Sequence, residues 1–187
     1  MSGRRRAVRP QRTRFFIGCE GESEQGYVAL LQRMADAGGL HVHLDAIVLQ
    51  PGGGDPCAIV EQALKRMKAR EKQAGDPYAF RFVLLDADKR GQQPQRDARA
   101  VTLAADILHL IWQDPCYEAV LLRHLQGCAQ LRPPLTPDAL VQLRQRWPEY
   151  GKPMPAARLA TRVDTDALQR VRPVEPDLAT LLDAVGL

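Results

Sequence analysis

Residues 80–88 read Phe-Arg-Phe-Val-Leu-Leu-Asp-Ala-Asp, an apolar run that ends in two acidic residues. An earlier run, residues 15–24, ends in the same way and reads Phe-Phe-Ile-Gly-Cys-Glu-Gly-Glu-Ser-Glu. Short apolar runs of this kind predict buried strands. If the two strands are parallel and belong to one sheet, their carboxyl ends lie side by side, where α/β sheets place their ligands. The two runs therefore predict a cluster of carboxylates at one edge of a sheet.

The expected cluster consists of Glu20, Glu24, Asp86 and Asp88. Two unit charges about 4 Å apart repel by about 4 kcal/mol at the effective dielectric of a protein surface, and a hard divalent cation relieves that repulsion. Alternation along an extended segment places Asp86 and Asp88 on one face, about 7 Å apart, so both could reach one magnesium or manganese ion. The turn after Glu20 leaves the direction of Glu24 open. The alternative is a solvated acidic loop at each strand end.

Strand and helix patterns alternate over the first 115 residues. Strands are predicted at residues 14–19, 42–49, 80–86 and 107–112. Helices are predicted between them, at residues 24–37, 55–72 and 97–105, and Asp55-Pro56 has the N-cap and first-turn proline of a helix start. This order predicts an α/β fold with a mostly parallel central sheet flanked by helices, followed by a helical part from about residue 115.

The composition is that of an ordinary globular domain. The chain has 187 residues and 45% hydrophobic content, which excludes disorder throughout. No apolar run approaches the roughly 18 residues of a membrane span, and no signal-type segment follows the N-terminus. Four cysteines without a CxxC pair indicate free thiols in a reducing compartment. We therefore expect one domain, residues 14–187, in the cytoplasm and without a membrane partner.

Residues 1–13 are expected to form a flexible basic arm. The first 14 positions contain no acidic residue and six arginines: Arg4, Arg5, Arg6, Arg9, Arg12 and Arg14. These six positive charges exceed the net charge of the whole chain, which is +4, so the positive balance of the chain comes from the arm. An arginine arm could contact the phosphates of a nucleic acid. The alternative is a solvated tail that aids solubility.

Three stretches together resemble a known family. They are residues 19–27 (Cys-Glu-Gly-Glu-Ser-Glu-Gln-Gly-Tyr), 83–88 (Val-Leu-Leu-Asp-Ala-Asp) and 114–125 (Asp-Pro-Cys-Tyr-Glu-Ala-Val-Leu-Leu-Arg-His-Leu). The first two resemble the Toprim fold of primases, topoisomerases and OLD-type nucleases. The third is similar to the RloB-like proteins, which are found beside restriction and phage-defence genes. It departs from that family at two positions, since Tyr117 and Val120 stand where the family typically has phenylalanine and tryptophan. Tyr150-Gly151-Lys152 also resembles a Tyr-x-Lys of the family, so the likeness covers most of residues 14–155.

The resemblance implies a chemistry for the acidic residues. In Toprim proteins the acid matching Glu20 works near the reacting phosphate, and the acids matching Asp86 and Asp88 hold magnesium. The implied protein is a magnesium- or manganese-dependent nuclease acting on RNA or DNA in defence against mobile elements, with Glu24 as a further catalytic residue. A defence ATPase and a second copy of the chain are further implied partners. The alternative is a non-catalytic Toprim module that binds a nucleic acid or nucleotide and signals to a partner.

Four further residues are secondary candidates for the site, and each could have either a functional or a structural role. Glu118 lies at a helix start, where an acid is either a structural cap or a site residue. His124 is flanked by leucines and is either a polar core residue or an acid–base group. Lys89 follows the acidic pair, and Lys152 could return to the same face. These two cations could clamp a phosphate or offset the acidic charge.

Overall fold

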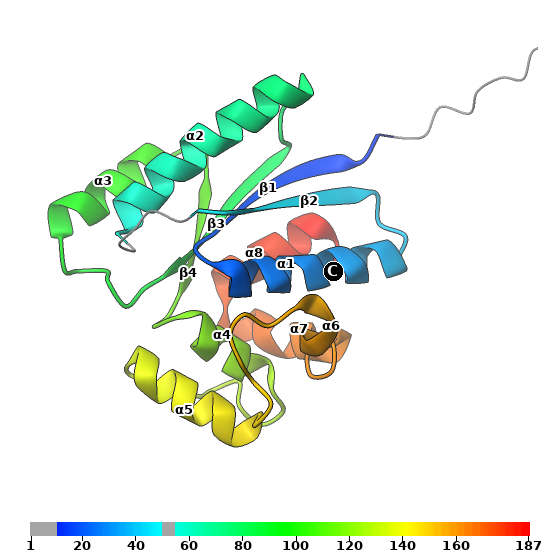
Figure 1. Ribbon diagram of the computed structural model, residues 1–187, viewed down its shortest axis with the longest axis vertical. Helices are drawn as coiled ribbons and strands as arrows, with labels where there is room; N and C mark the ends of the chain where they lie inside the picture. The colour runs from blue at the N-terminus through cyan, green and yellow to red at the C-terminus, as the bar shows by residue number, and fades with distance from the viewer. Residues whose placement is uncertain (1–10, 50–54) are drawn as a thin grey trace, which may run out of the picture.

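The computed structural model describes residues 11–49 and 55–187. In this part of the chain, four parallel strands form the centre of the molecule in the order β2-β1-β3-β4 (Figure 1). The strands are β1 (Thr13–Cys19), β2 (Val42–Val48), β3 (Phe80–Asp86) and β4 (His109–Gln113). The predicted α/β fold with a parallel central sheet is confirmed. Because β1 pairs with β3, the two apolar runs that end in carboxylates are neighbours, as the sequence predicted.

Helices cover both faces of the sheet (Figure 1). On one face α2 (Pro56–Ala74) packs against α3 (Pro94–Ala104), and on the other lies α1 (Glu22–Ala37). The helical C-terminal part joins the side of α1 and consists of α4 (Tyr117–His124), α5 (Thr136–Arg146), α6 (Ala156–Leu159), α7 (Thr165–Val171), the 3₁₀ helix η1 (Arg172–Val174) and α8 (Pro176–Val185). Across the described ranges, no helix combines the length and the apolar character needed to cross a membrane.

The apolar character of β1 follows from its central position. Phe15, Ile17 and Cys19 enter a core formed with α1 and the C-terminal helices, whereas Phe16 enters a second core formed with α2 and α3. All four side chains are completely buried. A strand covered on both faces needs a continuous apolar run, because alternate side chains point to opposite faces. The run at residues 15–19 therefore fixes β1 at the middle of the fold and brings its carboxyl end to the sheet edge.

Helix boundaries follow the capping residues. The Asp55 side chain accepts a hydrogen bond from the Cys57 backbone N–H at 3.1 Å, and Pro56 is the first residue of α2, so the predicted helix start is confirmed. α1 begins at Glu22, two residues earlier than predicted, because Gly21 serves as its N-cap. α3 begins at Pro94 rather than residue 97, since proline suits the first helical position.

The fourth strand begins two residues later than predicted. The backbone N–H groups of Ile107 and Leu108 both bond to the carbonyl of Ala104, at 3.0 and 2.8 Å. These bonds belong to the turn that closes α3. The apolar pattern of residues 107–112 therefore includes two turn residues before β4 starts at His109.

Candidate active site

The carboxyl ends of β1 and β3 bring Glu20 and Asp86 into contact. Glu20 Oε2 accepts a hydrogen bond from the backbone N–H of Asp86 at 3.0 Å. Burial is the largest influence on the pKa of Glu20 and raises it above its ordinary value, although the hydrogen bond from Asp86 opposes the shift. The acids that end the two apolar runs therefore share one small volume.

Asp86 is also held by the start of α4. Its Oδ1 accepts a hydrogen bond from the backbone N–H of Tyr117 at 2.8 Å. Burial is the main cause that raises the pKa of Asp86 to about 8, and the charges of Glu24 and Glu20 raise it further. An ionised carboxylate at this position is therefore poorly compensated by the protein, and a nearby cation would stabilise it.

Glu24 points toward the same volume. It lies in the first turn of α1 and is only 5% exposed, and its Oε2 accepts a hydrogen bond from the backbone N–H of Gly21 at 3.1 Å. Burial is the main cause that raises the pKa of Glu24, and the carboxylates of Glu20 and Glu118 raise it as well. The structure thus gives the direction of Glu24 that the sequence left open.

Glu118, Tyr150 and Lys152 form a second polar group beside these acids. Glu118 is 1% exposed, and its Oε1 accepts the Tyr150 hydroxyl at 2.9 Å and forms an ion pair with Lys152 Nζ at 2.5 Å. Within the described ranges, the buried Oε2 of Glu118 has no hydrogen-bond partner. Burial lowers the pKa of Lys152, but the hydrogen bond and charge of Glu118 outweigh it, so the net pKa is raised. Lys152 is therefore held as a cation at the site.

Four of these residues, Glu20, Glu24, Asp86 and Lys152, line one pocket of about 510 Å³. Pro153, next to Lys152, lines it as well. The pocket lies at the carboxyl edge of the sheet, where parallel α/β folds place their ligands. Its oxygens could hold a hard cation, and Lys152 could contact a phosphate oxygen.

The position of the Lys152 segment depends on a close approach of α1. A Cβ atom added at Gly26 would lie only 2.3 Å from the carbonyl oxygen of Met154. A glycine is therefore required at this point of α1 for the chain after Lys152 to pass so near. The contact places Pro153 against the pocket that Glu24 also lines.

Asp88 lies outside this pocket. Its Oδ2 accepts a hydrogen bond from Thr136 Oγ1 at 3.0 Å, and its side chain is exposed. This placement differs from the expectation that Asp86 and Asp88 share one face of an extended segment. The reason is that β3 ends at Asp86 and the chain then turns, with the Arg90 backbone N–H bonded to the Ala87 carbonyl. Asp88 still influences the site, since its charge raises the pKa of Glu20 after the larger effect of burial.

The donor set fits a hard cation, although it is not a preassembled metal centre. Among the residues that the structure describes, no three His, Cys, Asp or Glu side chains are already grouped around a metal position. Glu20, Glu24 and Asp86 nevertheless offer oxygen ligands only. In each of them, one carboxylate oxygen accepts a hydrogen bond from a backbone N–H, which fixes the side chain. The buried, unpartnered Oε2 of Glu118 adds a further oxygen beside them. An all-oxygen set of this kind suits magnesium or manganese.

His124 is placed in the core and does not line the pocket. Its Nε2 lies 2.9 Å from the Tyr27 hydroxyl and its Nδ1 lies 2.9 Å from the Val120 carbonyl. Burial is the main cause that lowers its pKa to about 4. The neutral ring therefore joins α4 to α1, which matches the polar-core interpretation of the sequence.

The basic candidates are distributed over different parts of the fold. The charge of Lys89 lowers the pKa of Glu20, but less than burial raises it, so Lys89 lies near the site. Arg12 pairs with Asp36 at 3.0 Å, and Arg14 pairs with Asp76 at 3.7 Å. These two arginines lie at the opposite end of β1 from Glu20, roughly 20 Å away along the strand. The expected contacts of Arg4, Arg5, Arg6 and Arg9 fall outside the described residues.

Sequence reasoning did not find the link between Glu118 and Lys152. The two residues are 34 positions apart and belong to no periodic pattern, so spacing alone could not join them. The available signal was that each residue lies in a stretch that resembles the RloB-like family. The role of the Tyr117 backbone N–H was missed as well, although Pro115 just before α4 marks a helix start whose first N–H groups need acceptors.

We expect Lys152→Met to lower the free energy of unfolding by about 1–3 kcal/mol, because it leaves the buried carboxylate of Glu118 without its cation. Chemical denaturation measures the loss. Lys152→Arg should restore most of it, and Lys68→Met, at an exposed lysine of α2, is the matched control and should change little. Equal losses for Lys152→Met and Lys68→Met would contradict a structural role for the Glu118–Lys152 pair.

A family model, and not an individual relative, identifies the family. No curated protein and no solved structure matches the chain at a significant level. The model of the family described as "RloB-like protein" matches residues 15–171, which include both carboxylate-bearing strand ends, α4 and Lys152. With most of its length matched, the chain belongs to the RloB-like family.

Proposed function

We propose that the protein is a metal-dependent nuclease that cleaves phosphodiester bonds in RNA or DNA. The observation that carries the proposal is the convergence of Glu20, Glu24 and Asp86 on one pocket with Lys152. Clustered carboxylates that are buried or partly buried and have raised pKa values are unfavourable unless a cation or a proton neutralises them, so such clusters are typical of functional sites.

Four residues of the pocket would have a role in this reaction. Asp86 and Glu20 would hold magnesium or manganese, with Glu24 completing the oxygen set. The ion, when bound, supplies Lewis-acid stabilisation of charge on the phosphoryl oxygens. Lys152 would contact a non-bridging oxygen of the phosphate and orient it, because Glu118 holds its ammonium group at the pocket wall. Glu20 or Glu24 would accept the proton of the attacking water.

The family resemblance supports the biological setting of the proposal. RloB-like proteins resemble Toprim-fold, OLD-type nucleases and occur beside restriction and phage-defence genes. That resemblance supports a cytoplasmic defence function with a partner protein such as an ATPase.

The direct test is a cleavage assay with purified full-length protein. Labelled tRNA, single-stranded and duplex RNA and DNA are incubated with magnesium, manganese or EDTA. We expect cleavage of at least one substrate with a divalent metal and none in EDTA. If no substrate is cut and neither metal raises the melting temperature, the non-catalytic binding module replaces the nuclease.

A further inference from the structure

The arginines of the described chain differ in whether they form an ion pair. Around the sheet, five of them pair with a carboxylate: Arg12, Arg14, Arg81, Arg96 and Arg99. The exposed Arg66, Arg70 and Arg90 form no ion pair within the described residues. In the C-terminal helical part, Arg123 and Arg172 are paired, whereas the exposed Arg146, Arg158 and Arg162 form no ion pair within residues 11–49 and 55–187. Arg33 of α1 is exposed and without an ion pair in the same way, so these four positive charges on α1 and the C-terminal helical part are uncompensated.

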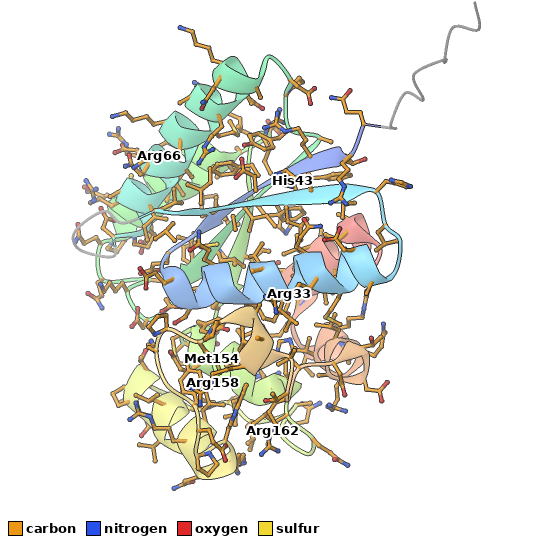
Figure 2. All side chains as sticks on the ribbon, turned by 45° about the vertical axis from the view of Figure 1, so that its right-hand side comes forward. Arg33, His43, Arg66, Met154, Arg158 and Arg162 are labelled. Atoms are coloured by element: carbon orange, nitrogen blue, oxygen red, sulfur yellow. The ribbon has the colours of Figure 1, made fainter. Side chains whose placement is uncertain are left out.

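Arg33, Arg158 and Arg162 lie along one face of the molecule (Figure 2). In that view Arg33, Met154, Arg158 and Arg162 follow one another from α1 across α6 to the segment before α7. Arg146, at the end of α5, lines the same hollow as Arg162. We call the surface formed by Arg33, Arg146, Arg158 and Arg162 the basic face.

A groove connects the basic face to the carboxylate pocket. This groove, of about 970 Å³, is lined by Arg33 and the segment 153–156, and it shares Glu22 and Pro153 with the carboxylate pocket. A hollow of about 310 Å³ is lined by Arg158 and Arg162, and another of about 440 Å³ is lined by Arg146 and Arg162. Because Ala156 lines the groove and Arg158 lines the smaller hollow, α6 joins the two. The arginines of the basic face therefore extend from the groove beside the pocket to these hollows.

Because the pocket is acidic, cations outside it would strengthen the binding of the proposed substrate. Without a bound metal ion, Glu20, Glu24 and Asp86 repel a phosphate chain, and the charge of Lys152 is partly offset by Glu118. Further affinity for a polyanion would then come from cations outside the pocket. Two carboxylates, Glu149 and Asp164, also line the hollows of the basic face, but the arginines there outnumber them.

We propose that the basic face binds the sugar–phosphate backbone of the nucleic acid whose phosphodiester enters the carboxylate pocket, an inference that rests on the proposed function. Guanidinium groups set in a row match a repeating anion, and they form bidentate hydrogen bonds with phosphate oxygens. A row connected to the pocket by the groove would align the strand so that one phosphate reaches Lys152.

The test is the binding of fluorescently labelled single-stranded RNA and DNA of one sequence, measured by anisotropy in EDTA over a range of salt concentrations. The variant R158Q/R162Q should bind at least about tenfold more weakly in moderate salt. The slope of log K against log salt should become shallower by about 1.4, since each lost phosphate contact contributes about 0.7 on a single strand. The stronger of the RNA and DNA responses identifies the sugar.

The matched control is R96Q/R99Q. It changes the net charge of the chain by the same amount. The arginines that it removes already form ion pairs, Arg96 with Asp55, the N-cap of α2, and Arg99 with Glu61 of α2. We expect its affinity and salt slope to stay near those of the wild type, and thermal melts check that both variants are folded. If the two double variants weaken binding equally, the effect is one of overall charge and the inference is wrong.

Two outcomes separate this inference from the proposed function. Weaker binding by R158Q/R162Q in EDTA, together with no cleavage of any substrate, would support the basic face and remove the nuclease. Cleavage by the wild type with unchanged binding by R158Q/R162Q would leave the nuclease and overturn the basic face. Loss of binding to phosphatidylserine vesicles, with unchanged nucleic-acid binding, would assign the face to a membrane and also overturn the inference.

Discussion

Asp86→Asn is expected to abolish metal-dependent cleavage, with a loss of at least about 100-fold, and yet to leave the metal-free fold as stable as the wild type or more stable. The two effects share one cause. Asp86 is partly buried beside Glu20 and Glu24, so its ionised form is unfavourable without a cation and its pKa rises to about 8. Asparagine removes the charge but keeps an oxygen that can accept the Tyr117 backbone N–H.

The sign of the stability change follows from this pKa. A carboxyl group whose pKa is higher in the folded protein than in the unfolded chain destabilises the fold once it ionises, so stability falls as the pH rises from about 4 towards 8. Near pH 7, Asp86→Asn relieves that cost, and we expect a gain of about 1–2 kcal/mol in EDTA. For a chain of this length the gain corresponds to a melting temperature higher by about 2–8 °C.

Metal titration completes the test. Millimolar magnesium or manganese should raise the melting temperature of the wild type by mass action and leave that of Asp86→Asn unchanged. Asp88→Asn is the comparison variant. Because Asp88 is exposed and bonded to Thr136, we expect a smaller loss of metal response than at Asp86. If Asp86 serves instead as an ion-pair partner of a nearby cation, the same substitution should destabilise the metal-free protein, and metal should have no effect on the wild type.

The part of this site that lies on neighbouring strands was predictable from sequence. Residues 15–19 and 82–85 are apolar because both faces of β1 and β3 are covered there, and this pattern is local and strong. Once the strands are parallel neighbours, the contact between Glu20 and Asp86 follows from the sheet itself. The predicted start of α2 at Asp55-Pro56 was reliable for the same reason, since capping depends on residues adjacent in sequence.

The remaining features depend on contacts between distant segments. The turn after Asp86 redirects Asp88 to Thr136, 48 residues away, and strand periodicity cannot anticipate that turn. The arginines of the basic face come from α1, α5, α6 and the segment before α7, so no sequence window contains them together. Arg12 and Arg14, which the sequence grouped with the arm, pair with Asp36 and Asp76. Charge counts along the chain therefore identified neither which arginines are compensated nor which share a face.

Arg123→Met is expected to lower the free energy of unfolding by about 3–5 kcal/mol, the range for removing one partner of a buried ion pair. Arg123 is 1% exposed and forms an ion pair with Glu175, and its guanidinium also donates to the Asp114 carbonyl at 2.8 Å. It therefore joins α4 to the N-cap of α8 and to the segment that precedes Pro115. Chemical denaturation measures the loss, and Arg99→Met, at an exposed ion pair of α3, should cost less than about 1 kcal/mol.

The pH dependence of that loss identifies its cause. Burial already raises the pKa of Glu175 despite the opposing charge of Arg123, and without Arg123 the pKa should rise further. A carboxyl group of raised pKa can take up a proton, so the penalty in Arg123→Met should be largest near pH 7 and shrink as the pH falls towards about 4, where Glu175 is also protonated in the unfolded chain. Arg123→Met combined with Glu175→Gln should remove the pH-dependent part of the loss. A loss that is the same at both pH values would instead mean that Arg123 acts through packing and its backbone contacts. The start of α4, which holds Asp86 through the Tyr117 N–H, would then depend on side-chain volume at position 123 and not on charge.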